Sequence, residues 1–173
     1  IGAGKVEVSG SGGKTQTVET RNIVIATGSD FARLKGIEID EKRIVTSTGA
    51  LELQKVPERL VLVGGGVIGL EMGSVWRRLG ADVTVLEALP AFLGAVDEQI
   101  AREAAKLFAR QGLKISLGVK IEKVAVEKKG KAEEVRVEYT DSAGAAQTLA
   151  VDRLIVSIGR VPNTIGLAPE AIG

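Results

Sequence analysis

The stretch from residue 60 to residue 87 constrains the fold of this 173-residue chain more than any other part of it. Residues 60 to 63 form an apolar run typical of a strand buried on both faces. A glycine-rich loop from Gly64 to Gly69 follows directly, and residues up to 79 then read as a helix with an apolar face. Residues 82 to 86 read as a second strand, which ends at Glu87. This order of elements predicts two parallel strands joined by a helix.

The loop sequence, Gly-Gly-Gly-Val-Ile-Gly, fits the spacing G-x-G-x-x-G, in which each glycine has its own task. Gly64 allows a tight turn, Gly66 lets the backbone approach a pyrophosphate, and Gly69 lets the helix pack on the strand without a Cβ between them. The amides of Gly66, Val67 and Ile68 would face the pyrophosphate, with the helix dipole behind them. We therefore expect a bound dinucleotide here. The alternative is a glycine turn without a ligand.

Glu87 indicates which dinucleotide binds. It lies at the end of the second strand, 23 residues after Gly64. A carboxylate at this position accepts hydrogen bonds from the adenosine ribose hydroxyls and repels a 2′-phosphate. An NADP site would favour Arg or Lys shortly afterwards, but residues 88 to 92 contain neither. The sequence therefore favours NAD over NADP.

The remaining pattern extends this unit into a complete sheet. A helix is expected at 97 to 111 and further buried strands at 113 to 117 and 153 to 158. Residues 121 to 126, 134 to 139 and 147 to 150 alternate as antiparallel strands. We therefore predict an α/β fold: a Rossmann-like parallel sheet with an antiparallel three-stranded crossover.

The first 56 residues have a different pattern. Alternation at 5 to 9 and 15 to 19 predicts an antiparallel ribbon, and the apolar run at 23 to 26 predicts a buried strand. The rest of this region reads as a connector with one short helix, for which Ser47 or Thr48 would be the cap.

Composition narrows the possible chemistry. The chain has no cysteine and no histidine, so it lacks a thiolate nucleophile and the commonest acid–base group near neutral pH. We expect no catalytic residue and no metal site. The net charge of +1 gives no electrostatic reason to expect nucleic acid or a membrane as partner. No apolar run approaches the length of a membrane span.

Five segments, in order, resemble those of the dihydrolipoamide dehydrogenases, the E3 enzymes among the flavin disulfide reductases. They are residues 25 to 29, 43 to 51, 64 to 76, 79 to 87 and 158 to 163. The family oxidises protein-bound dihydrolipoamide through a cysteine pair and FAD and passes a hydride to NAD. The resemblance thus implies NAD and FAD as cofactors. It also implies lipoyl domains of a 2-oxo acid dehydrogenase complex as partners, a homodimer, and the cytoplasm or mitochondrial matrix as location.

The resemblance also implies roles for particular residues. NAD would be contacted by Gly64, Gly65, Gly66, Val67, Ile68, Gly69, Leu70, Glu71 and Glu87. Ile121 would touch the adenine end through its backbone, and Gly159 would lie along the nicotinamide half. Thr27, Gly28 and Ser29 would belong to the FAD site.

By this resemblance, residues 1 to 56 are the end of an FAD domain with a connector, 57 to 163 the NAD domain, and 164 to 173 the return to the FAD domain. The FAD fingerprint, the cysteine pair and the family's His-Glu dyad are missing, and Lys35 stands where the family often has proline. We expect a central fragment that is inactive alone. Two alternatives are a free-standing NAD-binding module and the NAD domain of another flavin disulfide reductase.

Overall fold

The computed structural model describes residues 2 to 130 and 132 to 172, which form two compact units. The larger unit spans residues 31 to 159, and the smaller one combines residues up to 30 with those from 160 onward. No helix in the described part of the chain is both long enough and apolar enough to cross a membrane.

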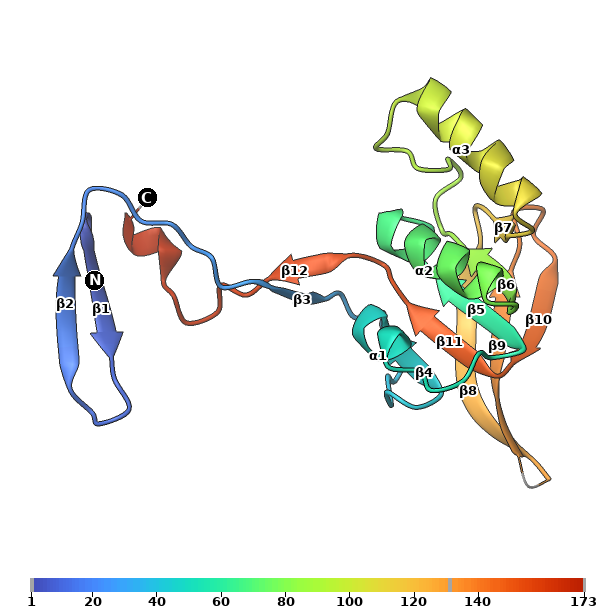
Figure 1. Ribbon diagram of the computed structural model, residues 1–173, viewed down its shortest axis with the longest axis horizontal. Coiled ribbons are helices and arrows are strands. Elements are labelled where there is room, and N and C mark those ends of the chain that lie inside the picture. Colours follow the sequence, from blue (N-terminus) through green and yellow to red (C-terminus); the bar gives the residue numbers. More distant parts are fainter. Residues whose placement is uncertain (1, 131, 173) are drawn as a thin grey trace. The chain divides into compact units, whose positions relative to one another are not determined.

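A five-stranded parallel sheet forms the centre of the larger unit (Figure 1). Its strands, in spatial order, are β4 (Ile44–Thr46), β11 (Arg153–Val156), β5 (Arg59–Val63), β6 (Asp82–Leu86) and β7 (Lys114–Ser116). The four strands expected from the sequence are confirmed. The fifth, β4, comes from the region that we read as a connector. All three of its residues are buried, so pairing and burial outside the local sequence make it a strand.

Three helices follow strands of this sheet: α1 (Ser47–Leu51), α2 (Val67–Arg78) and α3 (Glu98–Arg110). The expected cap of α1 was wrong, since neither Ser47 nor Thr48 caps it. Thr46 does so, because its backbone is extended and its hydroxyl accepts a hydrogen bond from the Gly49 amide. Asp97 caps α3 by accepting from the amides of Gln99 and Ile100.

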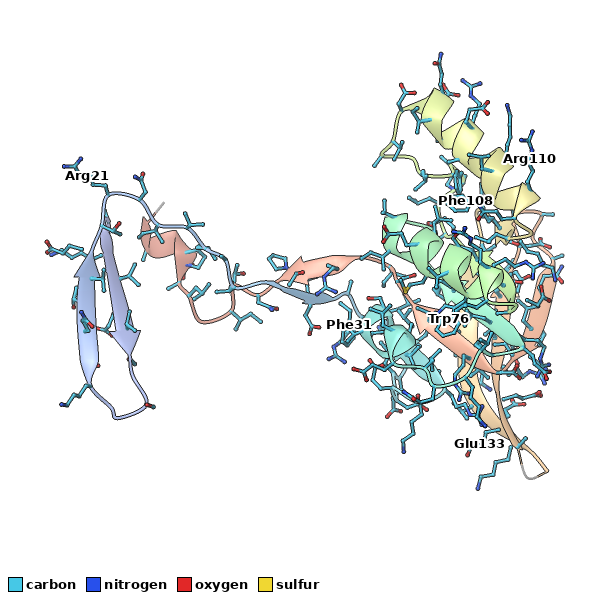
Figure 2. The ribbon with its side chains drawn as sticks, viewed as in Figure 1. Arg21, Phe31, Trp76, Phe108, Arg110 and Glu133 are labelled. Carbon is cyan, nitrogen blue, oxygen red and sulfur yellow. The ribbon has the colours of Figure 1, made fainter. Side chains whose placement is uncertain are left out.

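The antiparallel crossover is confirmed as a three-stranded sheet with the order β10-β9-β8. Its strands are β8 (Lys120–Lys129), β9 (Ala132–Thr140) and β10 (Ala146–Val151). One core cluster joins this crossover to the parallel sheet through residues such as Val63, Val137 and Val156. A second joins the sheet to the helices and contains Trp76, which is only 7% exposed and points inward from α2 (Figure 2). The parallel sheet is therefore covered on both faces, as its apolar strands require.

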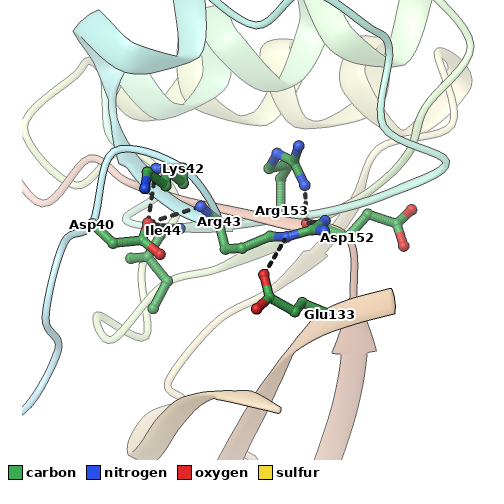
Figure 3. Close-up of polar contacts among 7 residues, drawn as sticks. All are labelled: Asp40, Lys42, Arg43, Ile44, Glu133, Asp152 and Arg153. Atoms are coloured by element: carbon green, nitrogen blue, oxygen red, sulfur yellow. Dashed lines mark hydrogen bonds and ion pairs between the residues drawn. The ribbon is translucent and has the colours of Figure 1, made fainter. Parts of the chain in front are cut away.

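Charged groups gather where the strands of the parallel sheet begin (Figure 3). The Arg59 side chain donates to the Asp152 carboxylate at 2.8 Å, and the Arg59 backbone amide donates to the same carboxylate at 2.9 Å. Burial alone would raise the pKa of Asp152, but these hydrogen bonds and the positive charge of Arg59 hold it below its ordinary value. Asp40 behaves similarly: burial opposes ionisation, yet amides of Ile44, Lys42 and Arg43 donate to its carboxylate and lower its pKa. Asp152 thus ties β11 to β5, and the Arg43 guanidinium, which donates to the Asp152 carbonyl at 3.3 Å, ties β4 to β11.

The smaller unit contains the expected ribbon, with β1 (Lys5–Ser9) antiparallel to β2 (Thr15–Glu19). A further pair joins β3 (Ser29–Phe31) to β12 (Arg160–Pro162), and a 3₁₀ helix spans Pro169–Ile172. The strand expected at residues 23 to 26 was wrong. Val24 is 86% exposed, and the described residues provide no strand to pair with it. An apolar run becomes a buried strand only where neighbours satisfy its backbone and cover its faces.

Candidate dinucleotide-binding site

Strand register aligns three residues at the carboxyl edge of the parallel sheet. Val63 pairs with Leu86 on β6 and with Val156 on β11, so Gly64, Glu87 and Ser157 each follow an aligned strand end. From β5 the chain continues to β6 on one side of β5, and the later strand β11 pairs with the other side of β5. A reversal of strand order of this kind opens a crevice at the carboxyl ends, where ligands bind in open α/β sheets.

Gly64 and Gly69 are required by close packing at this edge. Gly64 has a φ of +105°, and a Cβ there would come within 2.4 Å of the Ser157 carbonyl oxygen. A Cβ on Gly69 would lie 2.0 Å from the Gly64 carbonyl oxygen and 2.8 Å from the Ser157 hydroxyl oxygen. The Ser157 hydroxyl donates toward the carbonyls of Val63 and Gly64 at 3.2 Å each. The glycine loop is therefore pressed tightly between β11 and the start of α2.

Gly66 differs from these two glycines. Its backbone is extended, with φ of −74°, and no described atom beyond its neighbours lies within 4 Å of where its Cβ would be. It precedes α2, and no side chain in the described part of the chain caps that helix. The first amides of α2 therefore face open space with the positive end of the helix dipole, an arrangement suited to an anion.

Glu87 holds the loop from the neighbouring strand. One carboxylate oxygen accepts from the Gly65 amide at 2.6 Å, and the other accepts from the Leu89 amide at 2.8 Å. Each oxygen of an ionised carboxylate keeps a second lone pair, so Glu87 could still accept hydrogen bonds from a ligand. Glu87 thus fixes the loop and can also accept hydrogen bonds from a ligand.

These elements surround a cavity of about 770 Å³, within the range of small-molecule and cofactor sites. Seven of the expected NAD contacts lie on its wall: Gly64, Gly66, Val67, Ile68, Glu87, Ile121 and Gly159. They come from separate parts of the sequence, so the fold brings them together. The open cradle at Gly66 and the carboxylate of Glu87, bound to the adjacent Gly65 amide, fit a dinucleotide.

Four other expected NAD residues do not line this cavity. Gly65 is buried, and its link to the cavity is the hydrogen bond that its amide donates to Glu87. Gly69 serves helix packing, as described above. Leu70 and Glu71 instead line a second hollow beside α2, together with Val67 and Phe108.

Part of the cavity wall was not predicted from the sequence. Ser157 lines the cavity and was detectable only as the single hydroxyl in an otherwise apolar run. Residues 120 to 124 all line it, although side chains of a regular strand alternate between two faces. The reason is a register shift between Ile121 and Lys123, which leaves Glu122 without a partner in the ladder. Residues 34 to 37 also line the cavity.

The three residues expected at an FAD site lie in the smaller unit. The Thr27 hydroxyl donates to the backbone carbonyl of Asn163, and the backbone amide of Asn163 donates to the Gly28 carbonyl at 3.0 Å. The Arg160 guanidinium donates to the Ser29 hydroxyl at 2.7 Å and also to its carbonyl. These polar groups are thus engaged within the unit itself.

Comparison with known proteins agrees with this geometry. A family profile described as pyridine nucleotide-disulphide oxidoreductase matches residues 1 to 173. The chain belongs to this family. Fold and family therefore agree on an α/β dinucleotide-binding architecture.

Two relatives are dihydrolipoyl dehydrogenases. The enzyme of Cupriavidus necator is 54% identical over 169 residues, covering 98% of this chain and 34% of the relative. The mitochondrial enzyme of Dictyostelium discoideum is 44% identical over 172 residues, covering 99% of this chain and 35% of the relative. The chain thus spans about a third of the length of these curated relatives.

A solved structure shares the fold. The Cu(II) complex of the HOCl-induced flavoprotein disulfide reductase RclA from Escherichia coli aligns with a TM-score of 0.75 at 30% identity. The alignment covers 100% of this chain and 37% of RclA.

Proposed function

We propose that this chain is the NAD(H)-binding part of a dihydrolipoyl dehydrogenase, with residues 57 to 163 as the binding domain. The single observation that carries the proposal is the cavity that the uncapped start of α2 and Glu87 line together. The first feature suits a pyrophosphate and the second suits an unphosphorylated ribose. The 54% identity to the Cupriavidus necator dihydrolipoyl dehydrogenase supports the choice of enzyme.

In this proposal the chain's own residues bind and orient the cofactor. The amides of Gly66, Val67 and Ile68 would bind the pyrophosphate, and Glu87 would accept from the adenosine ribose. Ile121 would contact the adenine end, and residues around Gly159 would lie along the nicotinamide half. When bound, NAD supplies a hydride acceptor. Gly69 and Ser157 would keep the loop in place.

The rest of the activity would come from outside this sequence, since the chain has no cysteine for dithiol exchange. FAD, the cysteine pair, lipoyl-domain partners in a 2-oxo acid dehydrogenase complex and homodimerisation enter the proposal through the relatives. The chain would be inactive alone. Its location would be the cytoplasm in a bacterium or the mitochondrial matrix in a eukaryote. Thr27, Gly28 and Ser29 would contribute to the FAD site of the whole enzyme.

The test is calorimetric titration of the full chain with NADH and with NADPH. We expect NADH to bind more tightly, because the Glu87 carboxylate repels the 2′-phosphate. Glu87→Ala should weaken NADH binding by about 1 kcal/mol or more, the value of a charge-assisted hydrogen bond, and should narrow the difference between the two cofactors. Equal affinities of the unaltered chain for NADH and NADPH would contradict the proposal.

A matched control is Glu52→Gln, which removes an exposed acid that does not line the cavity. It should leave both affinities unchanged. A similar loss in both variants would indicate a general charge effect rather than a contact in the site.

A further inference from the structure

The turn at residues 34 to 37 forms part of the cavity wall, although it lies outside both the glycine loop and the crossover. The Ile37 amide donates to the Leu34 carbonyl at 3.2 Å, and Gly36 has a φ of +85°. A four-residue turn with positive φ at its third position has the pattern of a type II turn. Lys35 occupies the second position of this turn, a place that also accepts proline.

Packing fixes the backbone of this turn. Leu34 and Ile37 are half-buried and pack against the core cluster between the parallel sheet and the crossover. Just before the turn, the Ala32 amide donates to the Gly159 carbonyl at 2.9 Å. The turn is therefore held near the Gly159 end of the cavity, and the Lys35 side chain extends from a fixed point.

Pairing and position together distinguish Lys35 from the other lysines of the wall. Three lysines line the cavity: Lys35, Lys120 and Lys123. Lys120 pairs with Glu122 at 3.1 Å, whereas neither of the other two has an ion pair within residues 2 to 130 and 132 to 172. Lys123 lies on β8, in the crossover, whereas Lys35 lies in the turn beside Gly159.

We propose that Lys35 is a further cofactor-binding residue, whose ammonium group binds a phosphate of the dinucleotide from the Gly159 side. This inference rests on the proposed function of the cavity. A lysine ammonium is a compact charge with three donors on a flexible stem, which suits it to an anion in the cavity that it shares with the start of α2. Because Glu87 and Glu122 also line the cavity, a cation on the other side offsets their repulsion of that anion.

Two substitutions separate charge from turn geometry. Lys35→Gln removes the charge and keeps a long polar side chain, while Lys35→Pro removes the charge and suits the second position of the turn. Lys42→Gln is the control, because Lys42 is an exposed lysine of the same region that does not line the cavity. Calorimetric titration of each full chain with NADH, at low and at high ionic strength, measures the effect.

We expect both Lys35 variants to bind NADH about threefold to tenfold more weakly than the unaltered chain at low ionic strength, as for a partly exposed ion pair. The difference should shrink at high salt because screening weakens exposed charge pairs. Lys42→Gln should change the affinity less than about twofold, because this exposed lysine does not line the cavity and acts on its contents only through solvent.

Unchanged NADH affinity in the Lys35 variants would overturn the inference and leave the proposed function standing. A loss in only one of them, or an equal loss in Lys42→Gln, would also overturn it. If the unaltered chain binds no NADH, the proposed function fails and the role of Lys35 fails with it.

Discussion

At the amino edge of the parallel sheet, Asp152 and Asp40 are satisfied by groups of the chain itself, whereas at the carboxyl edge Glu87 faces a cavity. Asp152 is held by the side chain and amide of Arg59, and Asp40 accepts three backbone amides. Glu87 also accepts two amides, but it shares its surroundings with Gly66 and the uncapped start of α2.

The difference shows how one sheet separates stability from binding. At the amino edge, Asp152 joins the starts of β11 and β5 and Asp40 holds the start of β4, and we expect the loss of either carboxylate to affect folding. At the carboxyl edge, the loop after β5 leaves backbone amides facing open space, and we expect changes there to affect cofactor affinity. Three experiments test this division, beginning with the largest expected effect.

The two glycines of the carboxyl edge should respond differently to an added methyl group. Gly69→Ala places a Cβ 2.0 Å from the Gly64 carbonyl oxygen, so we expect a loss of about 3 kcal/mol in the free energy of unfolding. Gly66→Ala meets no described atom within 4 Å and should cost about 1 kcal/mol or less. It should nevertheless weaken NADH binding roughly tenfold, because the Cβ occupies the approach of the pyrophosphate.

Urea unfolding and NADH titration of both variants measure these effects. The comparison fails if Gly66→Ala destabilises the fold as much as Gly69→Ala does. It also fails if Gly66→Ala binds NADH as the unaltered chain does.

The amino edge should show the reverse behaviour. Hydrogen bonds from Arg59 lower the pKa of Asp152 against the opposing effect of burial, so its stabilising contribution is present at neutral pH and is lost as the pH falls through its folded-state pKa. Asp152→Asn should therefore cost about 1 kcal/mol at pH 7, allowing for partial exposure of the pair. The cost should shrink toward pH 3, while NADH affinity at pH 7 stays the same.

Unfolding of this variant by urea at several pH values gives the measurement. Glu38→Gln, which alters an exposed acid of the connector, serves as the control and should change little at any pH. A pH-independent cost for Asp152→Asn would show that the ion pair with Arg59 does not contribute as described.

Much of the fold could be predicted because its signals are local. The apolar runs of β5, β6 and β11 and the glycine loop before α2 lie within short windows of sequence. Strands β3, β4 and β12 could not be predicted in this way, because three residues without a longer apolar run give too little pattern and only pairing with a distant segment makes them strands. The run at 23 to 26 has the composition of a strand without a partner among the described residues.

The candidate site likewise contains residues with a local sequence signal and residues brought together only by folding. Gly64, Gly66 and Glu87 follow from a motif within one βαβ unit, so the sequence identified them. The wall formed by residues 34 to 37 and Ser157 depends on segments that meet only after folding. The β8 bulge at Glu122 likewise has no local signature, because it arises from the pairing of two strands.

The most direct test of the account is to record backbone amide resonances of the ¹⁵N-labelled full chain as NADH is added. The account predicts that the largest shifts occur at Gly65 through Ile68, near Glu87 and at Gly159, while the amides of Ile44 and Arg59 at the amino edge remain unchanged. Shifts concentrated at the amino edge, or none at saturating NADH, would contradict the assignment of the cofactor site to the carboxyl edge.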